Sequence, residues 1–232
     1  MAELLKTKTA PEIKQIMKIS DDLTDKTVAL ISAWNSRPEH QRQAIDSFLG
    51  DIYSGLQLAS WDKADLKYAN THLLILSGLY GLLRPMDGIC PYRLEMGYKL
   101  PGIESASLYK YWGKDLVNIL SDSEYIVNLT AKEYSRLITD YIDTSRVIEP
   151  RFLSLNQKTK QPTFVVVHAK IARGAFASWM IKNRVEAIQD LIKFNGLGYV
   201  YDESLSSPNT PVFICRNFKG LGLSVRLNQQ VL

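Results

Sequence analysis

The aliphatic runs of this chain are short, and this limits the folds that it can adopt. Leu73–Leu76, Val165–Val167 and Val212–Ile214 hold only three or four residues each. A membrane-spanning helix needs roughly 20 consecutive apolar residues, so none of these runs is long enough to span a membrane. Short aliphatic runs of this kind are typical of buried strands. The sequence therefore predicts several short strands within a globular fold.

Apolar residues with helical spacing fill the segments between these runs. The predicted helices cover about 13–17, 20–31, 39–49, 62–72, 107–119, 131–142, 170–184 and 186–194, and the predicted strands cover about 73–76, 92–96, 125–129, 146–155, 163–169, 199–201 and 212–214. We expect an α/β (α+β) fold in a single domain, residues 1–232, with a mixed β-sheet surrounded by helices. Residues 1–50 are predicted to form a helical N-terminal part, and about 218–232 a weakly anchored tail.

The sequence favours a cytoplasmic protein without a metal or an organic cofactor. It opens without the apolar segment of a secretory signal, and its two cysteines, Cys90 and Cys215, lie far apart and outside any CxxC pattern. The three histidines lack metal-ligand spacing, and neither a phosphate-binding Walker loop nor a GxGxxG motif is present. We therefore expect free thiols, no cofactor and no membrane partner.

Positive charge is concentrated in the last third of the chain. Residues 152–232 carry ten Lys and Arg against four Asp and Glu, a balance of +6, whereas the whole chain has a net charge of +4. This asymmetry is typical of a surface that meets polyanions. From the charge alone, a contribution to solubility explains it equally well.

Polar residues follow several of the predicted strands, where open α/β sheets bind ligands. Arg84 and Asp87 follow the first strand, and Arg93 and Glu95 share one face of the next, with Tyr92, Leu94 and Met96 on the other, inward face. Asn128, Thr130, Lys132, Glu133 and Tyr134 stand where a strand passes into a helix. If Arg84, Arg93, Lys170 and Arg173 converge, they form an anion receptor. Equally consistent is a network of internal ion pairs, Arg84 with Asp87 and Arg93 with Glu95.

Lys170 and Arg173 are predicted to occupy the first turn of a helix. They follow Val165–Val167 and precede Gly174, and two cations are unfavourable at the positive end of a helix. A nearby anion would compensate them. That anion is either an internal carboxylate, Glu95 or Glu133, or an external phosphate.

Six blocks of sequence carry a resemblance to a known family. The blocks are Ser77–Pro85, Pro91–Gly97, Leu108-Tyr109 with Trp112-Gly113, Asn128-Leu129 with Glu133-Tyr134, Lys170 with Ala172–Gly174, and Phe194-Asn195 with Gly198-Tyr199. In order and spacing, from about Pro11 to Arg216, they resemble the YaaA peroxide-stress family. Nothing in the chain matches the opening strand and the Ser-Pro-Ala-Lys segment usual in that family, and Ser178 stands where another Arg is common.

The resemblance implies a cytosolic DNA-binding protein that limits damage by hydrogen peroxide and helps to keep free iron low. It also implies a basic cleft and a helix-hairpin-helix-like element, which matches the turn Ile19–Leu23 here. Duplex or structured DNA is the expected partner, and a small anionic ligand is the alternative. The candidate nucleic-acid or anion-binding residues are Arg84, Arg93, Lys132, Lys170, Arg173, Lys182, Arg184, Lys18 and Lys26, and the candidate polar residues of the cleft are Asp87, Tyr92, Asn128, Thr130 and Tyr134.

Two functions are consistent with these residues. The first is a DNA-binding protein of the oxidative stress response that makes contacts to the phosphate backbone. The second is an enzyme that holds a phosphorylated or carboxylated small molecule on the same cations, with Glu95 or Glu133 as the proton-transfer group. A scaffold that binds a protein partner ranks below both.

Overall fold

The computed structural model describes residues 1–120 and 123–220. These fold into two compact units. The first unit contains residues 1–47, 74–120 and 132–142, and the second contains 48–73, 123–131 and 143–220. The mixed α/β class is confirmed. That residues 1–232 act as a single domain stays a prediction, and most of the predicted tail, 221–232, lies outside the described residues.

The first unit is largely helical. Its helices are α1 (Ala2–Lys6), α2 (Ala10–Met17), α3 (Asp21–Ala33), α4 (Ala44–Ser47), α7 (Leu108–Leu120) and α8 (Lys132–Thr139), and short 3₁₀ helices cover Pro38–His40 and Glu104–Ala106. Its strands are β1 (Arg42–Gln43), β2 (Ile75–Ser77), β3 (Gly81–Leu83) and β4 (Gly88–Ile89). β1 pairs with β4 and β2 with β3, both antiparallel.

The N-terminal pair of helices forms as predicted. Thr9 opens α2 with a capping box, in which its side chain accepts the Glu12 N–H while the Glu12 carboxylate accepts the Thr9 N–H at 2.7 Å. Lys18 ends α2 in the left-handed conformation, and the Ser20 side chain caps α3. The helix predicted over 39–49 is wrong. Two short helices there flank β1, whose pairing with β4 satisfies the backbone in place of a longer helix.

The second unit is built around a four-stranded mixed sheet. Its strands are β5 (Ile126–Val127), β6 (Val147–Ile148), β7 (Arg151–Leu155), β8 (Pro162–Thr163), β9 (Tyr199–Tyr201) and β10 (Val212–Cys215). The order in the sheet is β8-β7-β10-β9, with β7 parallel to β10 and the other pairs antiparallel. β5 and β6 form a separate parallel pair. The one mixed sheet expected from the sequence is therefore replaced by several small sheets.

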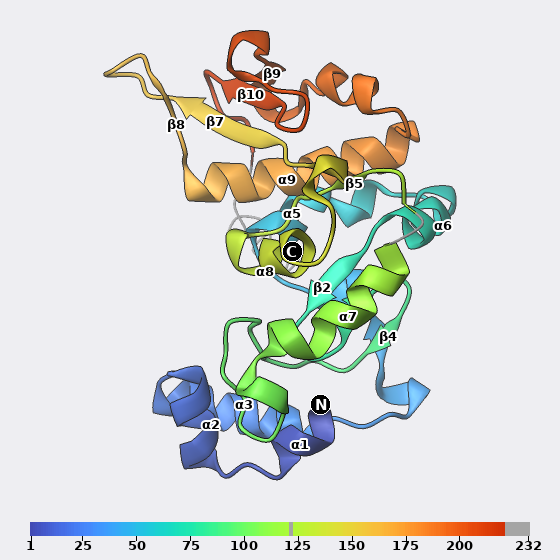
Figure 1. Ribbon diagram of the computed structural model, residues 1–232, viewed down its shortest axis with the longest axis vertical. Coiled ribbons are helices and arrows are strands. Elements are labelled where there is room, and N and C mark those ends of the chain that lie inside the picture. The colour runs from blue at the N-terminus through green and yellow to red at the C-terminus, as the bar shows by residue number, and fades with distance from the viewer. Residues whose placement is uncertain (121–122, 221–232) are drawn as a thin grey trace. The chain divides into compact units, whose positions relative to one another are not determined.

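Helix α9 (Val166–Asn183) organises the second unit. It contacts β7 on one side and α5 (Asp51–Leu56) on the other, and α6 (Lys63–His72) also packs on it (Figure 1). Short 3₁₀ helices cover Leu58–Ser60, Thr144–Arg146, Ile188–Lys193, Gly196–Gly198 and Glu203–Leu205. Between α9 and the sheet, Phe152, Phe176, Phe194 and Phe213 form a buried aromatic core, in which Phe152 stacks on Phe213 at 5.4 Å between ring centroids.

The strand predicted over 163–169 is shorter than expected. β8 ends at Thr163, and the β-branched run that follows opens α9 at Val166. Valine has a preference for strands, but packing of the long apolar face of α9 against the aromatic core overrides it.

Candidate functional site

The block Ser77–Gly81 packs tightly inside the first unit. The Ser77 hydroxyl shares a 2.6 Å hydrogen bond with the Tyr92 hydroxyl, and the Gly78 carbonyl oxygen accepts the indole N–H of Trp112 at 3.0 Å. A Cβ on Gly78 would collide with the Leu94 carbonyl. These glycines therefore permit close packing of the segments that carry the motifs.

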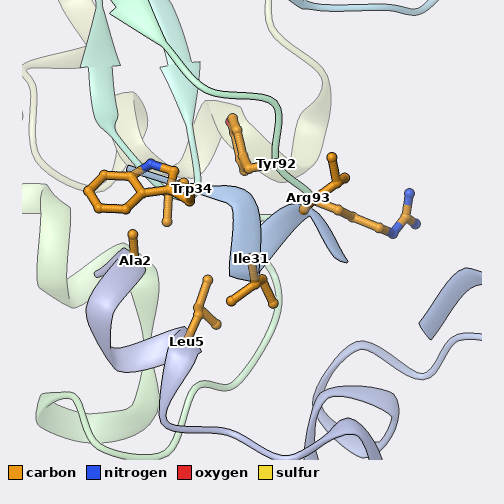
Figure 2. A pocket seen from close by; sticks show the side chains of 8 residues that line it. Ala2, Leu5, Ile31, Trp34, Tyr92 and Arg93 are labelled. Carbon is orange, nitrogen blue, oxygen red and sulfur yellow. The ribbon is translucent and has the colours of Figure 1, made fainter. Parts of the chain in front are cut away.

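Arg93 and its neighbour Tyr92 border a small cavity in this unit. Its other lining residues are Ala2, Leu5, Leu30, Ile31, Trp34 and Leu79, and its volume is about 10 Å³. Figure 2 shows the Arg93 side chain extending away from Ala2, Leu5 and Trp34. The volume corresponds to roughly one water molecule, so the cavity is too small for an organic ligand.

Arg93 is the one predicted site residue with a buried polar atom that has no hydrogen bond within the described residues. This atom is its Nε. The predicted ion pair of Arg93 with Glu95 does not form among these residues. Leu94 and Met96 are buried as predicted, whereas Tyr92, Arg93 and Glu95 are half-buried. Among the described residues, this segment pairs with no strand, so the strand predicted over 92–96 is wrong.

Two carboxylates and a phenol that the sequence singled out lie together in the first unit. The Tyr134 hydroxyl donates to Glu95 Oε2 at 3.2 Å, and Glu133 Oε1 accepts the Gly97 N–H at 2.7 Å. Burial, and after it the negative charge of Glu95, raises the pKa of Tyr134. Burial also raises the pKa of Tyr92. Both phenols are therefore neutral at neutral pH.

The remaining predicted residues of the first unit lie on its surface. The Arg84 N–H donates to Asp87 Oδ2 at 2.7 Å, which closes the turn after β3. Lys132 is exposed at the start of α8, and Lys18 is exposed at the end of α2. Lys26 forms a 2.9 Å ion pair with Asp22, so its charge is partly compensated.

In the second unit, Asn128 and Thr130 follow β5, and Glu149 follows β6, the parallel partner of β5. The Asn128 amide donates to Glu149 Oε1 at 2.8 Å, and its Oδ1 accepts the N–H and the hydroxyl of Thr130. Burial lowers the pKa of Arg173, and the charge of Glu149 opposes this effect. Glu149, which the sequence did not single out, is therefore the internal carboxylate that acts on Arg173.

Lys170 and Arg173 do not lie in the first turn of their helix. Because α9 begins at Val166, they stand in its second and third turns, away from the unpaired N–H groups. Lys170 is exposed and Arg173 is half-buried. The prediction that both cations occupy the first turn of the helix, at the positive end of its dipole, is therefore wrong. Arg84 and Arg93 belong to the first unit and Lys170 and Arg173 to the second, so the joint receptor of four cations stays a prediction.

Lys182 and Arg184 are held by contacts within the second unit. The Lys182 ammonium donates to the Ser60 carbonyl oxygen at 2.9 Å. Arg184 forms a 2.9 Å ion pair with the buried Asp65 and lies 4.6 Å above the ring of Tyr68. Both side chains therefore have structural contacts that a bound anion would have to displace.

Five cations of the second unit lie at one end of the four-stranded sheet. We call this group the hairpin surface and define it as Lys158, Lys160, Lys170, Arg216 and Lys219. All five are exposed, and none forms an ion pair within the described residues. The sequence singled out only Lys170. The available signal was the absence of acids, since residues 150–185 and 204–220 contain no Asp or Glu.

Three segments form the hairpin surface, and side-chain contacts connect them. Asn156 Oδ1 accepts the N–H groups of Lys158 and Thr159 and so shapes the turn between β7 and β8. The Gln157 amide of this turn donates to the Arg216 carbonyl oxygen at 2.9 Å. Phe218 stacks on His168 of α9, with 3.9 Å between ring centroids. The hairpin turn, the segment after β10 and the start of α9 are therefore neighbours.

Among residues 1–120 and 123–220, no group of three or more His, Cys, Asp or Glu side chains is placed to hold a metal ion. No described helix is long and apolar enough to cross a membrane.

The fold and the site define a mixed α/β protein whose second unit presents a basic surface with no acidic partner among the described residues. Residues 1–205 match the model of the family described as peroxide stress protein YaaA. A UPF0246 protein of Salinispora tropica is 50% identical over 226 residues, which cover 97% of this chain and 86% of that protein. UPF0246 proteins of Marinomonas sp. and Shewanella halifaxensis are 38% and 37% identical, over 92% of this chain and 84% and 86% of their own lengths. The chain belongs to the YaaA peroxide stress protein family.

Proposed function

We propose that this protein binds DNA through the hairpin surface during the response to hydrogen peroxide, and that it thereby protects DNA and helps to limit free iron. Family membership supports the link to peroxide stress. The observation that carries the binding proposal is the set of five exposed cations without an ion-pair partner in the described part of the chain. Cations that form no ion pair among the described residues are available to the phosphates of a nucleic-acid backbone.

Electrostatics favours this surface over the N-terminal helix pair as the contact with DNA. Near the turn of that pair, Asp21 and Asp22 occupy the first turn of α3, where they satisfy the helix dipole. Asp21 and Asp22 also form ion pairs with Lys14 and Lys26. A phosphate there would meet carboxylates, whereas the hairpin surface offers cations alone.

The salt dependence of DNA binding tests the proposal. If all five cations contact phosphates, the slope of log K against log salt is about −4.5, and raising NaCl from 50 to 200 mM weakens binding roughly 500-fold. Fluorescence anisotropy with a labelled duplex measures both quantities. The Lys158→Ala/Lys160→Ala variant should reduce the magnitude of the slope by about 2.

A matched control is available on the same unit. Lys63 and Lys67 are exposed cations of α6, and the Lys63→Ala/Lys67→Ala variant carries the same loss of charge away from the hairpin surface. It should keep the wild-type slope. Binding that does not depend on salt, or that both double variants weaken equally, contradicts the proposal.

The role in the cell needs a separate experiment. In a bacterial host that lacks its own family member, the wild-type protein should restore survival in hydrogen peroxide and lower the free iron measured by electron paramagnetic resonance. The Lys158→Ala/Lys160→Ala variant should restore neither at equal protein level. Full rescue by this variant would show that the protein does not need the hairpin surface for its role in peroxide stress.

A small-molecule function is the second candidate, and Arg93 is the observation that favours it. Its buried Nε has no hydrogen bond within the described residues, and leaving a buried donor unsatisfied costs about 1–3 kcal/mol. An anion bound beside the side chain would relieve that cost. Thermal shift with phosphate and nucleotides tests this candidate. A rise in melting temperature that Arg93→Lys abolishes supports it, and no response from the wild-type protein rejects it.

A further inference from the structure

Three apolar side chains are exposed beside the hairpin surface. Phe164, Val166 and Val167 are 56%, 53% and 47% exposed and follow β8 directly. Within the described residues, no other ring contacts Phe164. Aromatic side chains are usually buried, so an exposed and unstacked ring next to cations indicates a binding surface.

The hairpin fixes the position of this ring. Ser154 pairs with Thr163 and Leu155 with Pro162, and the Thr163 hydroxyl donates to the Ser154 carbonyl oxygen at 3.1 Å. Phe164 is the next residue after this pairing. At a rise of about 3.3 Å per residue, it stands at most roughly 13 Å along the chain from Lys160 in the turn. Val166, Val167 and Lys170 continue the surface onto one face of α9, because positions three and four apart are neighbours on a helix.

We propose that the hairpin surface binds single-stranded nucleic acid, with a base stacked on Phe164 and the adjacent phosphates held by Lys158, Lys160, Lys170 and Arg216. This inference rests on the proposed function and adds a preference for an unpaired strand. The bases of a duplex are stacked on one another and expose only their edges. An unpaired base presents its face, and stacking on an aromatic side chain is worth about 1–3 kcal/mol per base.

The observations favour this ligand over a lipid surface. A peripheral membrane helix presents a continuous apolar face. Here Ala169, Ala172 and Phe176 of α9 are buried in the core, and only Val166 and Val167 of its first turn are strongly exposed. The hairpin surface supplies five exposed cations beside the exposed ring of Phe164, as expected for a surface that follows a phosphate backbone.

Binding of labelled oligo-dT and of a duplex of equal length, compared by anisotropy at 100 mM NaCl, tests the inference. Phe164→Ala should weaken oligo-dT binding roughly 5- to 150-fold and duplex binding less than twofold. Phe164→Trp should retain affinity, and its added indole should be quenched by oligo-dT. Val200→Ala is the matched control, because Val200 is 64% exposed on β9, at the other edge of the same sheet, and it should change neither affinity.

The outcomes separate the two proposals. If both DNAs bind equally and Phe164→Ala changes neither affinity, the stacking inference fails and the proposed function stands. If neither DNA binds, both fail. If vesicles with 30% phosphatidylglycerol bind through Phe164 while oligo-dT does not bind, the surface recognises lipid and the inference is overturned. Circular dichroism melts of each variant establish that the fold is retained.

Discussion

Gly55 of α5 and Gly174 of α9 contact each other backbone to backbone where the two helices cross. A Cβ added to Gly174 would lie 2.9 Å from the Gly55 Cα and would collide with the Ile52 carbonyl oxygen. A Cβ on Gly55 would lie 3.0 Å from the Gly174 Cα. Since the obstacles are backbone atoms, no side-chain rotation relieves the collision. The glycine of the Ala172–Gly174 block therefore serves helix packing.

Gly174→Ala should destabilise the protein by about 2–3 kcal/mol. Overpacking costs more here than the roughly 1 kcal/mol that alanine gains in a helix interior. Urea denaturation followed by circular dichroism measures the difference. Val167→Ala, at an exposed position of the same helix, should stay within about 0.5 kcal/mol of wild type. Equal stability of Gly174→Ala and wild type would show that the helices can move apart without cost.

Arg184→Gln should lower the free energy of unfolding by about 1–2 kcal/mol, because it leaves the Asp65 carboxylate, with only 10% of its side chain exposed, without its cation. Arg136→Gln is the control. It breaks an exposed 3.4 Å pair with Asp140 and should cost no more than about 0.5 kcal/mol. Chemical denaturation of both variants gives the comparison, and equal costs would contradict a structural role for Arg184.

Stability should fall as the pH decreases from 7.5 to 5.5, and His168 should account for part of the fall. Burial lowers the pKa of His168 from its ordinary 6.5, so the unfolded chain binds a proton at a higher pH than the folded chain does. Below 6.5, the unfolded state therefore gains stability first. Urea midpoints at pH 7.5, 6.5 and 5.5 should decline less for His168→Gln than for wild type. Parallel declines would exclude this contribution.

The cysteines should resist oxidation in the folded protein. Cys90 and Cys215 are 4% and 1% exposed, and burial raises the pKa of Cys215, so its reactive thiolate is scarce at neutral pH. After millimolar hydrogen peroxide, mass spectrometry should find both thiols unmodified, and an aromatic disulfide reagent should titrate two thiols only after unfolding. A sulfenic or sulfinic acid in the native protein would indicate a redox-sensing role instead.

Local signals were sufficient to predict several elements. The helical spacing of apolar residues over 20–31 predicted α3, and the short apolar run Val212–Ile214 predicted β10. The alternation over 92–96 correctly predicted that Leu94 and Met96 are buried, whereas Tyr92, predicted to lie on the same face, is half-buried. In each case the determining interactions are made within a few residues of the chain.

Tertiary contacts decided the rest. The sequence could not pair Asn128 with Glu149, because their contact depends on the parallel register of β5 and β6. The sequence also could not assign Val166 to a helix, because α9 is stabilised by the packing of its later residues against the aromatic core. The sequence showed the hairpin surface only as an excess of positive charge in the last third of the chain. Its segments become neighbours through the contacts of Gln157 with Arg216 and of Phe218 with His168, which the sequence does not reveal.

The way the chain alternates between the two units has a consequence for its synthesis. Residues 48–73 belong to the second unit, yet α9, against which α5 packs, follows only after residues 74–120 and 132–142 of the first. Gly55 leaves the ribosome about 120 residues before Gly174, an interval of roughly 6–24 s at usual rates of translation. Throughout that time the nascent α5 segment has no helix to pack on. The apolar residues of α5 are therefore open to chaperones during that time, and a premature stop codon between residues 143 and 165 releases a product with every segment of the first unit but without the helix on which α5 packs.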